Sequence, residues 1–212
     1  ARKVRRLFND TVLAGFAGGT AVQAFMNTFL AAAAAGLAWA VVERLRDGHF
    51  TNLGAASGIV AGLVAITPAC GYVSSMSSIF IGLAAGVICC YAVHIKFRAG
   101  FDDALDVVGV HFVGGLVGSL MIGLFADADY FGAEHMNGLF YGGGLELLAE
   151  QALANGVTIV YSGIVTAVIL LAIKATIGLR VTEEVEATGL DVAEHAETAY
   201  NTGDAFMERA GF

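Results

Sequence analysis

The sequence predicts an all-α polytopic membrane protein with about six transmembrane helices. Hydrophobic residues make up 57% of the 212-residue chain and charged residues only 14%, whereas soluble domains are about 25% charged. A spanning helix needs about 20 mostly apolar residues, and the chain has several runs of that kind. Alanine-rich stretches without period-two alternation favour helices over strands. This composition excludes a water-soluble globular domain and also a disordered chain.

The apolar runs define the predicted spans in order. Residues 11–42 form one run that is too long for a single untilted span, and Asn27 and Thr28 lie in its middle. We therefore predict two spans there, at about 11–26 and 28–43. The remaining predicted spans are residues 57–72, 77–97, 107–126 and 157–178.

A long connection, residues 127–156, separates the last two spans. Its run of Gly142, Gly143 and Gly144 disfavours a continuous helix, and it contains Glu134, Glu146 and Glu150. We predict a structured outer loop with a short helix.

The distribution of basic residues predicts the orientation. If six helices cross alternately, all 11 Lys and Arg residues fall on one side. The opposite segments, near residues 26–28, 71–76 and 127–156, contain no Lys or Arg. The positive-inside rule makes the basic side cytoplasmic. Both ends of this multi-pass chain are therefore expected inside.

The acidic residues divide the chain into a transmembrane domain, residues 1–178, and an acidic cytoplasmic tail, residues 179–212. Eight of the 19 acids lie in residues 183–208, and the rest of the chain has 11 acids and 11 bases. The net charge of −8 therefore belongs to the tail. No stretch alternates basic and aromatic residues, so a nucleic-acid partner is not expected.

Small residues recur at four-residue spacing on three predicted helices. Such stripes allow helix backbones to approach closely in lipid, where apolar side chains gain little from burial. We therefore predict that they lie at helix–helix contacts. The residues are Gly54, Gly58 and Gly62, Gly82 and Gly86, and Gly114 and Gly118.

Ionisable residues gather at the start of the fifth predicted span: Asp102, Asp103, Asp106 and His111. An ionisable group inside a membrane is a functional candidate by default. If the helix starts at the acids, His111 lies roughly 13 Å along it, near the midplane of a hydrocarbon core about 30 Å thick. Asp103 and Asp106 lie nearer the cytoplasmic interface, where carboxylates also stabilise a helix N-terminus.

The face of the helix that carries His111 also carries Gly114, Gly115 and Gly118. An imidazole beside bare backbone faces either a tightly packed neighbour or a narrow cavity. The sequence leaves open whether His111 is a packed histidine bonded to another helix or a residue that lines a conduit.

Other chemistry has little support. Cys70, Cys89 and Cys90 are odd in number and lack a CxxC spacing, so they predict neither a disulfide framework nor a zinc site. No His/Glu/Cys spacing suggests a metal site, and no catalytic triad order or phosphate-cradling loop occurs. We expect no enzyme activity, no catalytic residues, no cofactor and no metal.

Several long segments resemble the ammonium transporter (Amt/Rh) family. The first is FDDALDVVGVHFVGG, residues 101–115, and the second is GAASGIVAGLVAITPACG, residues 54–71. Asn27 to Leu30, the Val-Glu-Arg that follows on the same apolar run, and the tail from Gly178 to Tyr200 are also similar to the family. The resemblance implies a fold of eleven spans, built from two inverted five-helix repeats and one long helix and assembled as a homotrimer. The chain aligns with the second half, spans six to eleven.

The resemblance also implies roles for single residues. His111 corresponds to one of two pore histidines, and its partner belongs to a span that this chain does not contain. Phe16 corresponds to a gate phenylalanine and Thr20 to a hydroxyl at the outer cation site. Asp103 corresponds to a carboxylate that fixes the local helix architecture, and Asp106 lies with it at the cytoplasmic vestibule. The tail would receive a PII-type signalling protein through a regulatory set of Glu183, Glu184, Gly189, Asp191 and Tyr200.

The implied function is transport of ammonium or ammonia across the plasma membrane, through a narrow hydrophobic pore lined by neutral histidine and surrounded by lipid. Two alternatives stay open: an ammonium sensor that signals through its tail, and a nonconducting half of a transporter. The sequence departs from the family pattern at several positions. Leu13 and Ala17 replace aromatic or polar residues, and Phe112 replaces a glycine next to the pore histidine.

Overall fold

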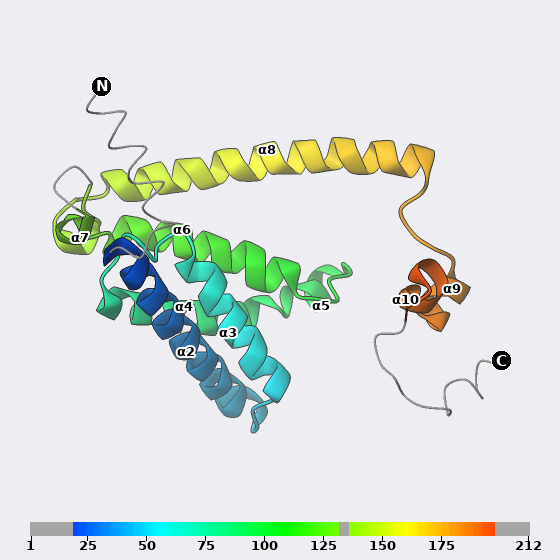
Figure 1. Cartoon of the computed structure of the whole chain (residues 1–212), viewed down its shortest axis with the longest axis horizontal. Coiled ribbons are helices and arrows are strands. Elements are labelled where there is room, and N and C mark those ends of the chain that lie inside the picture. The colour runs from blue at the N-terminus through cyan, green and yellow to red at the C-terminus, as the bar shows by residue number, and fades with distance from the viewer. Residues whose placement is uncertain (1–18, 132–135, 198–212) are drawn as a thin grey trace. The chain divides into compact units, whose positions relative to one another are not determined.

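The structure, a computed structural model, describes residues 19–131 and 136–197, which are predominantly helical (Figure 1). Across these residues the sole β-type pairing is an isolated bridge between Val73 and Ala126. The predicted all-α class is confirmed. The elements are α2 (Gly19–Asp47), α3 (Asn52–Ile66), α4 (Ser75–Ala92), α5 (Ile95–Ala99), the π-helix η1 (Val107–Phe112), α6 (Val113–Phe125), α7 (Ala128–Phe131), the 3-10 helix η2 (Leu139–Tyr141), α8 (Glu146–Thr176), α9 (Glu183–Thr188) and α10 (Leu190–His195).

One continuous helix, α2, stands where the sequence predicted two spans. The predicted break at Asn27 and Thr28 is wrong because both polar side chains donate hydrogen bonds without interrupting the helix. The Thr28 hydroxyl donates to the Ala24 carbonyl oxygen at 2.7 Å. The Asn27 amide donates to carbonyl oxygens of the α3–α4 connection. The part of the predicted first span before Gly19 lies outside the described residues.

The other predicted spans correspond to helices whose ends are shifted. Helix α3 starts five residues earlier than predicted because the Thr51 hydroxyl caps it, accepting from the Gly54 amide at 2.9 Å. It ends at Ile66, shortly before Pro68, which has no N–H to continue the helix. Helix α4 with α5, and η1 with α6, cover the next two predicted spans.

Helix α8 begins at Glu146, so the predicted extent of the outer loop is wrong for residues 146–156. The glycine run is non-helical, as predicted, but the irregular segment ends just after Gly144, which has a φ of +70°. Glu146 then stands in the first helical turn, where a carboxylate is favoured by the helix dipole. The short helix predicted for this connection corresponds to α7 and η2.

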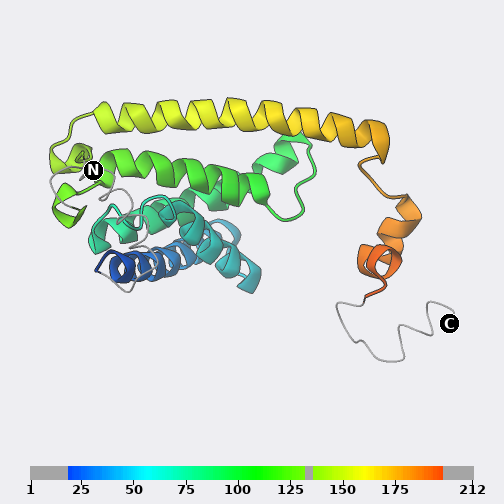
Figure 2. The same cartoon turned by 45° about the horizontal axis from the view of Figure 1, so that its top comes forward.

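Small residues bring α2, α3 and α4 into close contact (Figures 1 and 2). A Cβ atom at Gly62 would lie 2.6 Å from the Ala31 carbonyl oxygen, and Gly82 and Gly86 lie against the backbone of Ala31 and Ala35. These contacts place α4 parallel to α2, and α3 antiparallel to both. The predicted packing of the glycine stripes is confirmed. The core between the helices consists mainly of alanine and isoleucine: Ala31, Ala65, Ile66, Ile81 and Ala85 are all 0% exposed.

Within the described ranges, four helices are long and apolar enough to cross a membrane: Gly19–Asp47, Ser75–Ala99, Val107–Phe125 and Glu146–Thr176. Helix α3 is apolar but has only 15 residues. Large side chains such as Phe25, Phe29 and Leu37 are more than half exposed. In lipid this exposure carries no hydrophobic penalty, since lipid tails are as apolar as the side chains.

Basic residues occupy one end of this helix group. Arg44 and Arg46 lie in the last turn of α2, and Lys96 and Arg98 lie on α5, just beyond the end of α4. Because α2 and α4 are parallel, the four bases share an end, which we call the charged end. Since α2 is one helix, Gly19 lies at the opposite end. The prediction that both ends of the chain lie on one side therefore loses its basis for the N-terminal end.

The chain divides into two units, residues 1–158 and 159–212. The first contains α2 to α7 and the start of α8. The second contains the rest of α8, followed by α9 and α10. The predicted domain boundary between residues 178 and 179 lies in the non-helical segment, residues 177–182, between α8 and α9.

Candidate functional site

His111 lies on η1, a π-helix of six residues that continues directly into α6. The Val113 amide bonds to the Val108 carbonyl oxygen, five residues back, which is the π pattern. π-Helices are rare and are frequent at functional sites. The depth prediction assumed a helix starting at Asp102 and is wrong on that point, because the helix starts at Val107. The neighbouring Val110 nevertheless belongs to the same buried cluster as Ala61, near the middle of α3.

The side chain of His111 is exposed, and it forms no hydrogen bond with another described residue. The face predicted to carry it divides in two. Gly114 and Gly118 turn toward Val64 and Ala65 of α3, whereas a Cβ atom at Gly115 would meet no atom of a described residue within 4 Å. One side of η1 and α6 is therefore packed, and the side near His111 and Gly115 is open.

Asp103 caps the π-helix. Its carboxylate oxygens accept from the Val107 amide at 2.8 Å and from the Val108 amide at 2.9 Å. These are the free amides of a helix N-terminus, where a negative charge is stabilising. The geometry matches the interpretation of Asp103 as a helix N-terminal carboxylate.

Asp106 stands immediately before η1 in a left-handed conformation, with a φ of 54°. Its carboxylate forms an ion pair with Lys96, with 2.6 Å between Nζ and Oδ1. Lys96 also donates to the Asp103 carbonyl oxygen at 2.8 Å. Thus both acids predicted for the vestibule hold the chain that leads into the π-helix.

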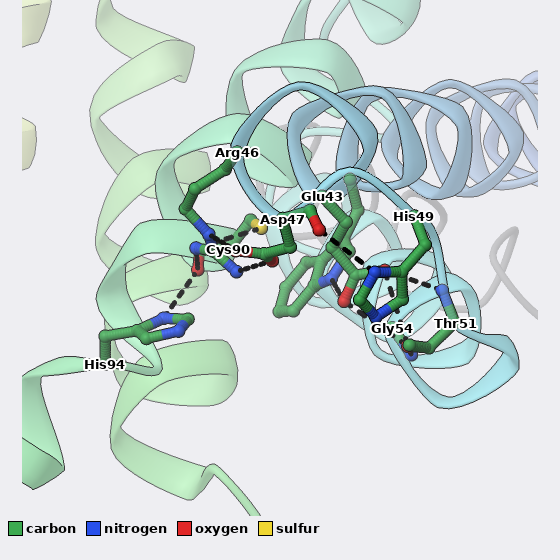
Figure 3. A network of polar contacts seen from close by, with 9 residues as sticks. Glu43, Arg46, Asp47, His49, Thr51, Gly54, Cys90 and His94 are labelled. Carbon is green, nitrogen blue, oxygen red and sulfur yellow. Dashed lines mark hydrogen bonds and ion pairs between the residues drawn. The ribbon is translucent and has the colours of Figure 1, made fainter.

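A second polar network lies at the charged end and was not predicted (Figure 3). The Glu43 carboxylate accepts from the Trp39 indole N–H at 3.2 Å and from the Thr51 amide at 2.9 Å, which joins α2 to the start of α3. Arg46 donates to the Cys90 carbonyl oxygen at 3.3 Å, which joins α2 to α4. The only sequence signal for this network was the similarity of the Val-Glu-Arg segment to a known family.

Arg46 also binds Asp47, through two nitrogen–oxygen contacts of 2.8 and 2.7 Å. The His94 ring nitrogen Nδ1 lies 3.2 Å from the Cys90 carbonyl oxygen, which therefore has both Arg46 and His94 as neighbours. Figure 3 shows these groups between the ends of α2 and α4.

The opposite end of the first unit holds uncharged polar contacts and a cavity. The Tyr141 hydroxyl lies 3.2 Å from Ser74 Oγ and 3.1 Å from Ser77 Oγ. The cavity has a volume of about 330 Å³ and is bounded partly by Tyr72, Asp127 and Gln151. His111 does not line it.

The remaining predicted pore residues receive less support from geometry. Thr20 lies in the first turn of α2 and is exposed, and Phe16 lies outside the described residues. Phe112, which follows His111, is 47% exposed.

The cysteines are free thiols. Cys89 and Cys90 are buried in α4, as expected for small apolar residues, and burial raises the pKa of the Cys70 thiol in the α3–α4 connection. No group of three or more metal-binding side chains is found among the residues that the structure describes.

The tail forms two short helices in the second unit. Thr182 caps α9 and Arg180 pairs with Glu186, with 3.1 Å between Nε and Oε1. Gly189, with a φ of +108°, joins α9 to α10, and a Cβ atom there would lie 2.8 Å from Asp191 Oδ1. Glu183 and Glu184 are exposed and Asp191 is partly buried. Tyr200 lies outside the described residues.

The apolar helices pack through glycine and alanine, as helices do in lipid. In the described part of the first unit, all basic residues lie at one end. These two features define a helical integral membrane protein. Residues 7–200 match the sequence model of the Ammonium Transporter Family. The chain belongs to this family.

Curated relatives include an ammonium transporter of Mycobacterium tuberculosis H37Rv, which is 53% identical over 192 residues. An ammonium transporter of Aquifex aeolicus is 48% identical over 188 residues. Each alignment covers 87% of this chain but only 40% and 43% of the relative. The chain thus spans about two fifths of the length of these relatives.

Solved structures agree with this assignment. Mep2 of Saccharomyces cerevisiae is 34% identical with a TM-score of 0.75, and the match covers 81% of this chain and 39% of Mep2. A structure described as a sensor Amt protein is 31% identical with a TM-score of 0.72, covering 84% of this chain and 42% of that one.

Proposed function

We propose that this chain forms part of a pathway that carries ammonium or ammonia across the plasma membrane, with His111 lining the pathway. Membership of the ammonium transporter family supports the substrate. The observation that carries the proposal is the position of His111. Its imidazole is exposed on the open side of η1, while α6, into which η1 continues, packs against α3 through Gly114 and Gly118.

An imidazole in an apolar passage suits this substrate. Ammonium and potassium have the same charge and similar size, so a negatively charged cavity alone cannot separate them. Moving a bare cation into an apolar passage is costly. Ammonium can lose a proton and cross as ammonia, and a neutral imidazole can accept or donate the hydrogen bond that guides the nitrogen. Potassium has no such route.

Residues near His111 would keep the passage narrow and apolar. Gly115 leaves room on the open side, and Phe112 places an exposed ring next to His111. We propose that this ring narrows the conduit, because the resemblance to the family implies a glycine, without a side chain, at this position. Thr20 and Phe16 remain proposals for the outer entrance.

The proposal extends to the assembly of the protein and to its regulation. We propose a homotrimer in lipid, which membership of the ammonium transporter family supports. The positive-inside rule favours a cytoplasmic position for the charged end, with Arg44, Arg46, Lys96 and Arg98. Lys174 and Arg180, at the start of the tail, favour the same side of the membrane for the tail. The exposed carboxylates of Glu183 and Glu184 are accessible to a PII-type signalling protein. Such a partner should lose affinity when residues 179–212 are deleted.

Flux through purified protein in liposomes tests the proposal. The full protein that the gene encodes is reconstituted as wild type, His111→Ala and His111→Lys, and methylammonium and potassium fluxes are recorded. We expect methylammonium flux without potassium flux in the wild type, and no methylammonium flux with the fixed positive charge of His111→Lys. Unchanged flux in His111→Ala would show that the imidazole has no role in conduction.

Two other functions remain as alternatives. A sensor function is favoured by the similarity to the sensor Amt protein and predicts ammonium-dependent changes in the tail with little flux. A nonconducting half of a transporter predicts that this chain alone carries no methylammonium. Reconstitution of this chain alone distinguishes the last case, because half of a two-repeat pathway should not conduct.

A further inference from the structure

The entry into the π-helix is held by one lysine from a different helix. Lys96 lies on α5, and its ammonium group reaches across to the segment before η1. There it forms an ion pair with Asp106 and donates to the Asp103 carbonyl oxygen, at 2.6 and 2.8 Å. The side chains of Lys96 and Asp106 are only 17% and 29% exposed, so the pair is partly shielded from water. Shielding from water makes an ion pair stronger than it is on an open surface.

These two contacts fix the residues that define the start of η1. Asp106 takes the left-handed conformation that turns the chain into the helix, which aspartate tolerates better than most residues other than glycine. The carboxylate of Asp103 binds the first two amides of η1, and Lys96 binds the carbonyl of the same residue. Lys96 therefore holds both the residue that caps the π-helix and the residue that precedes it.

The start of η1 determines where His111 points. A π-helix closes its bonds one residue later than an α-helix, so conversion of this segment to an α-helix would rotate the side chains that follow. The packed side leaves little freedom, since Gly109 lies against the backbone of Val93 and Gly118 against that of Ala65. A change of register would move His111 relative to the open side while Gly118 stays against α3.

We propose that Lys96 is a positioning residue for His111: by binding Asp106 and the Asp103 carbonyl it keeps the segment in π-helical register and the imidazole on the open side. This inference rests on the proposed conduction role of His111. Lys96 itself does not touch the permeating species. It should therefore affect the maximal flux through the pathway more than the apparent affinity for substrate.

The test uses the full protein in liposomes with four variants. Lys96→Met removes the charge but keeps most of the side-chain volume, and Lys96→Arg keeps the charge. Asp106→Asn removes the other half of the ion pair but keeps a residue that tolerates a left-handed backbone. Arg98→Met is the matched control, because Arg98 lies on the same short helix, is exposed and has the same charge.

We expect Lys96→Met and Asp106→Asn each to lower the maximal methylammonium flux at least tenfold, with a KM within twofold of wild type. The double variant should lose little more than either single variant, because the two residues act as one unit. Lys96→Arg should keep at least a third of the wild-type maximal flux, and the maximal flux of Arg98→Met should equal that of wild type. A wild-type maximal flux in Lys96→Met, or an equal loss in Arg98→Met, overturns the proposal.

A spectroscopic measurement separates positioning from general damage to the fold. Protein labelled with ¹⁵N-histidine reports the ring nitrogens of His111, assigned by their loss in His111→Ala. Their signals should shift or broaden in Lys96→Met while those of His49, at the end of α2, do not. Unchanged His111 signals in a folded Lys96→Met protein contradict the inference. Flux that survives His111→Ala removes the proposed function itself, whereas flux that needs His111 but not Lys96 removes only this inference.

Discussion

The side chain of Asn27, on α2, binds the backbone carbonyl oxygen of Val73, 46 residues further along the chain, at 2.8 Å. The same amide nitrogen donates to the Cys70 carbonyl oxygen, also at 2.8 Å. Asn27 is completely buried, so one side chain in the middle of an apolar run secures the connection between α3 and α4. This connection lies outside regular helix and has few other ways to satisfy its carbonyl groups without water.

Replacing Asn27 by Leu should destabilise the protein. The Cys70 carbonyl would lose its bond, and a buried unsatisfied polar group costs about 1–3 kcal/mol. The Val73 carbonyl would be spared in part, because Gln23 also donates to it at 2.9 Å. A lower midpoint of thermal unfolding in detergent is the expected result. Thr28→Val is the control, since the Thr28 hydroxyl donates to the Ala24 carbonyl oxygen of its own helix; an equal decrease in both variants would contradict the role given to Asn27.

Replacement by alanine should lower the stability of the protein at Gly118 but not at Gly115. A methyl group at Gly118 would collide with the Ala65 backbone, and overpacking of this kind typically costs about 1–3 kcal/mol. A methyl group at Gly115 would meet no atom within 4 Å in the part of the chain that the structure describes, so the stability of the protein should be unchanged. If the open side is the pathway, Gly115→Ala should instead lower methylammonium flux. Thermal unfolding and flux on the same preparations check both statements, and a stable Gly118→Ala protein would be evidence against the tight α3–α6 contact.

Loss of the Asp103 carboxylate should loosen the start of η1. Helix capping side chains contribute about 0.5–2 kcal/mol, and Asp103 binds two amides. Hydrogen exchange at the Val107 and Val108 amides should accelerate in Asp103→Ala, and less so in Asp103→Asn, which keeps one acceptor oxygen. Exchange near Thr51, where Glu43 and not Asp103 binds the amide, serves as the internal reference. Unchanged protection at Val107 would rule out the cap.

The Cys70 thiol should be slow to alkylate near neutral pH. Burial disfavours the thiolate and raises the pKa of Cys70, so at any given pH less of the reactive form is present in the folded protein. In a Cys89→Ala, Cys90→Ala background, the rate of maleimide labelling is measured against pH for folded protein and for protein unfolded in a denaturing detergent. The rate should rise at a higher pH in the folded protein. Coincident pH profiles would disprove a burial effect on this thiol.

The sequence predicted the class of fold and the helix contacts well, because both depend on short-range patterns. Glycine spacing predicts that Gly62 and Gly82 lie at helix–helix contacts, and the structure shows that both lie against α2. The break at Asn27 was predicted wrongly because a polar residue in an apolar run signals an interruption unless its distant partner is known. That partner, the Val73 carbonyl, is visible only once α3 folds back along α2.

The candidate site was predicted only in part, because the sequence reveals its residues but not the distant contacts that hold them. His111 and Asp103 stand out as ionisable residues at the start of an apolar segment, and the surrounding motif drew attention to them. The π-helix was not predictable, since nothing in the residues 107–112 distinguishes five-residue from four-residue bonding. Lys96 was counted only as one of the bases near the membrane surface, because its contact with Asp106 depends on a left-handed backbone ten residues away.

Few residue types satisfy the structural requirements at position 106. The left-handed backbone admits glycine, asparagine and aspartate far more readily than other residues, and of these only aspartate also supplies a negative charge for the ammonium group of Lys96. Natural variants that exchange this residue should therefore be scarce, and those that tolerate the loss of its charge should carry a neutral residue at position 96 as well.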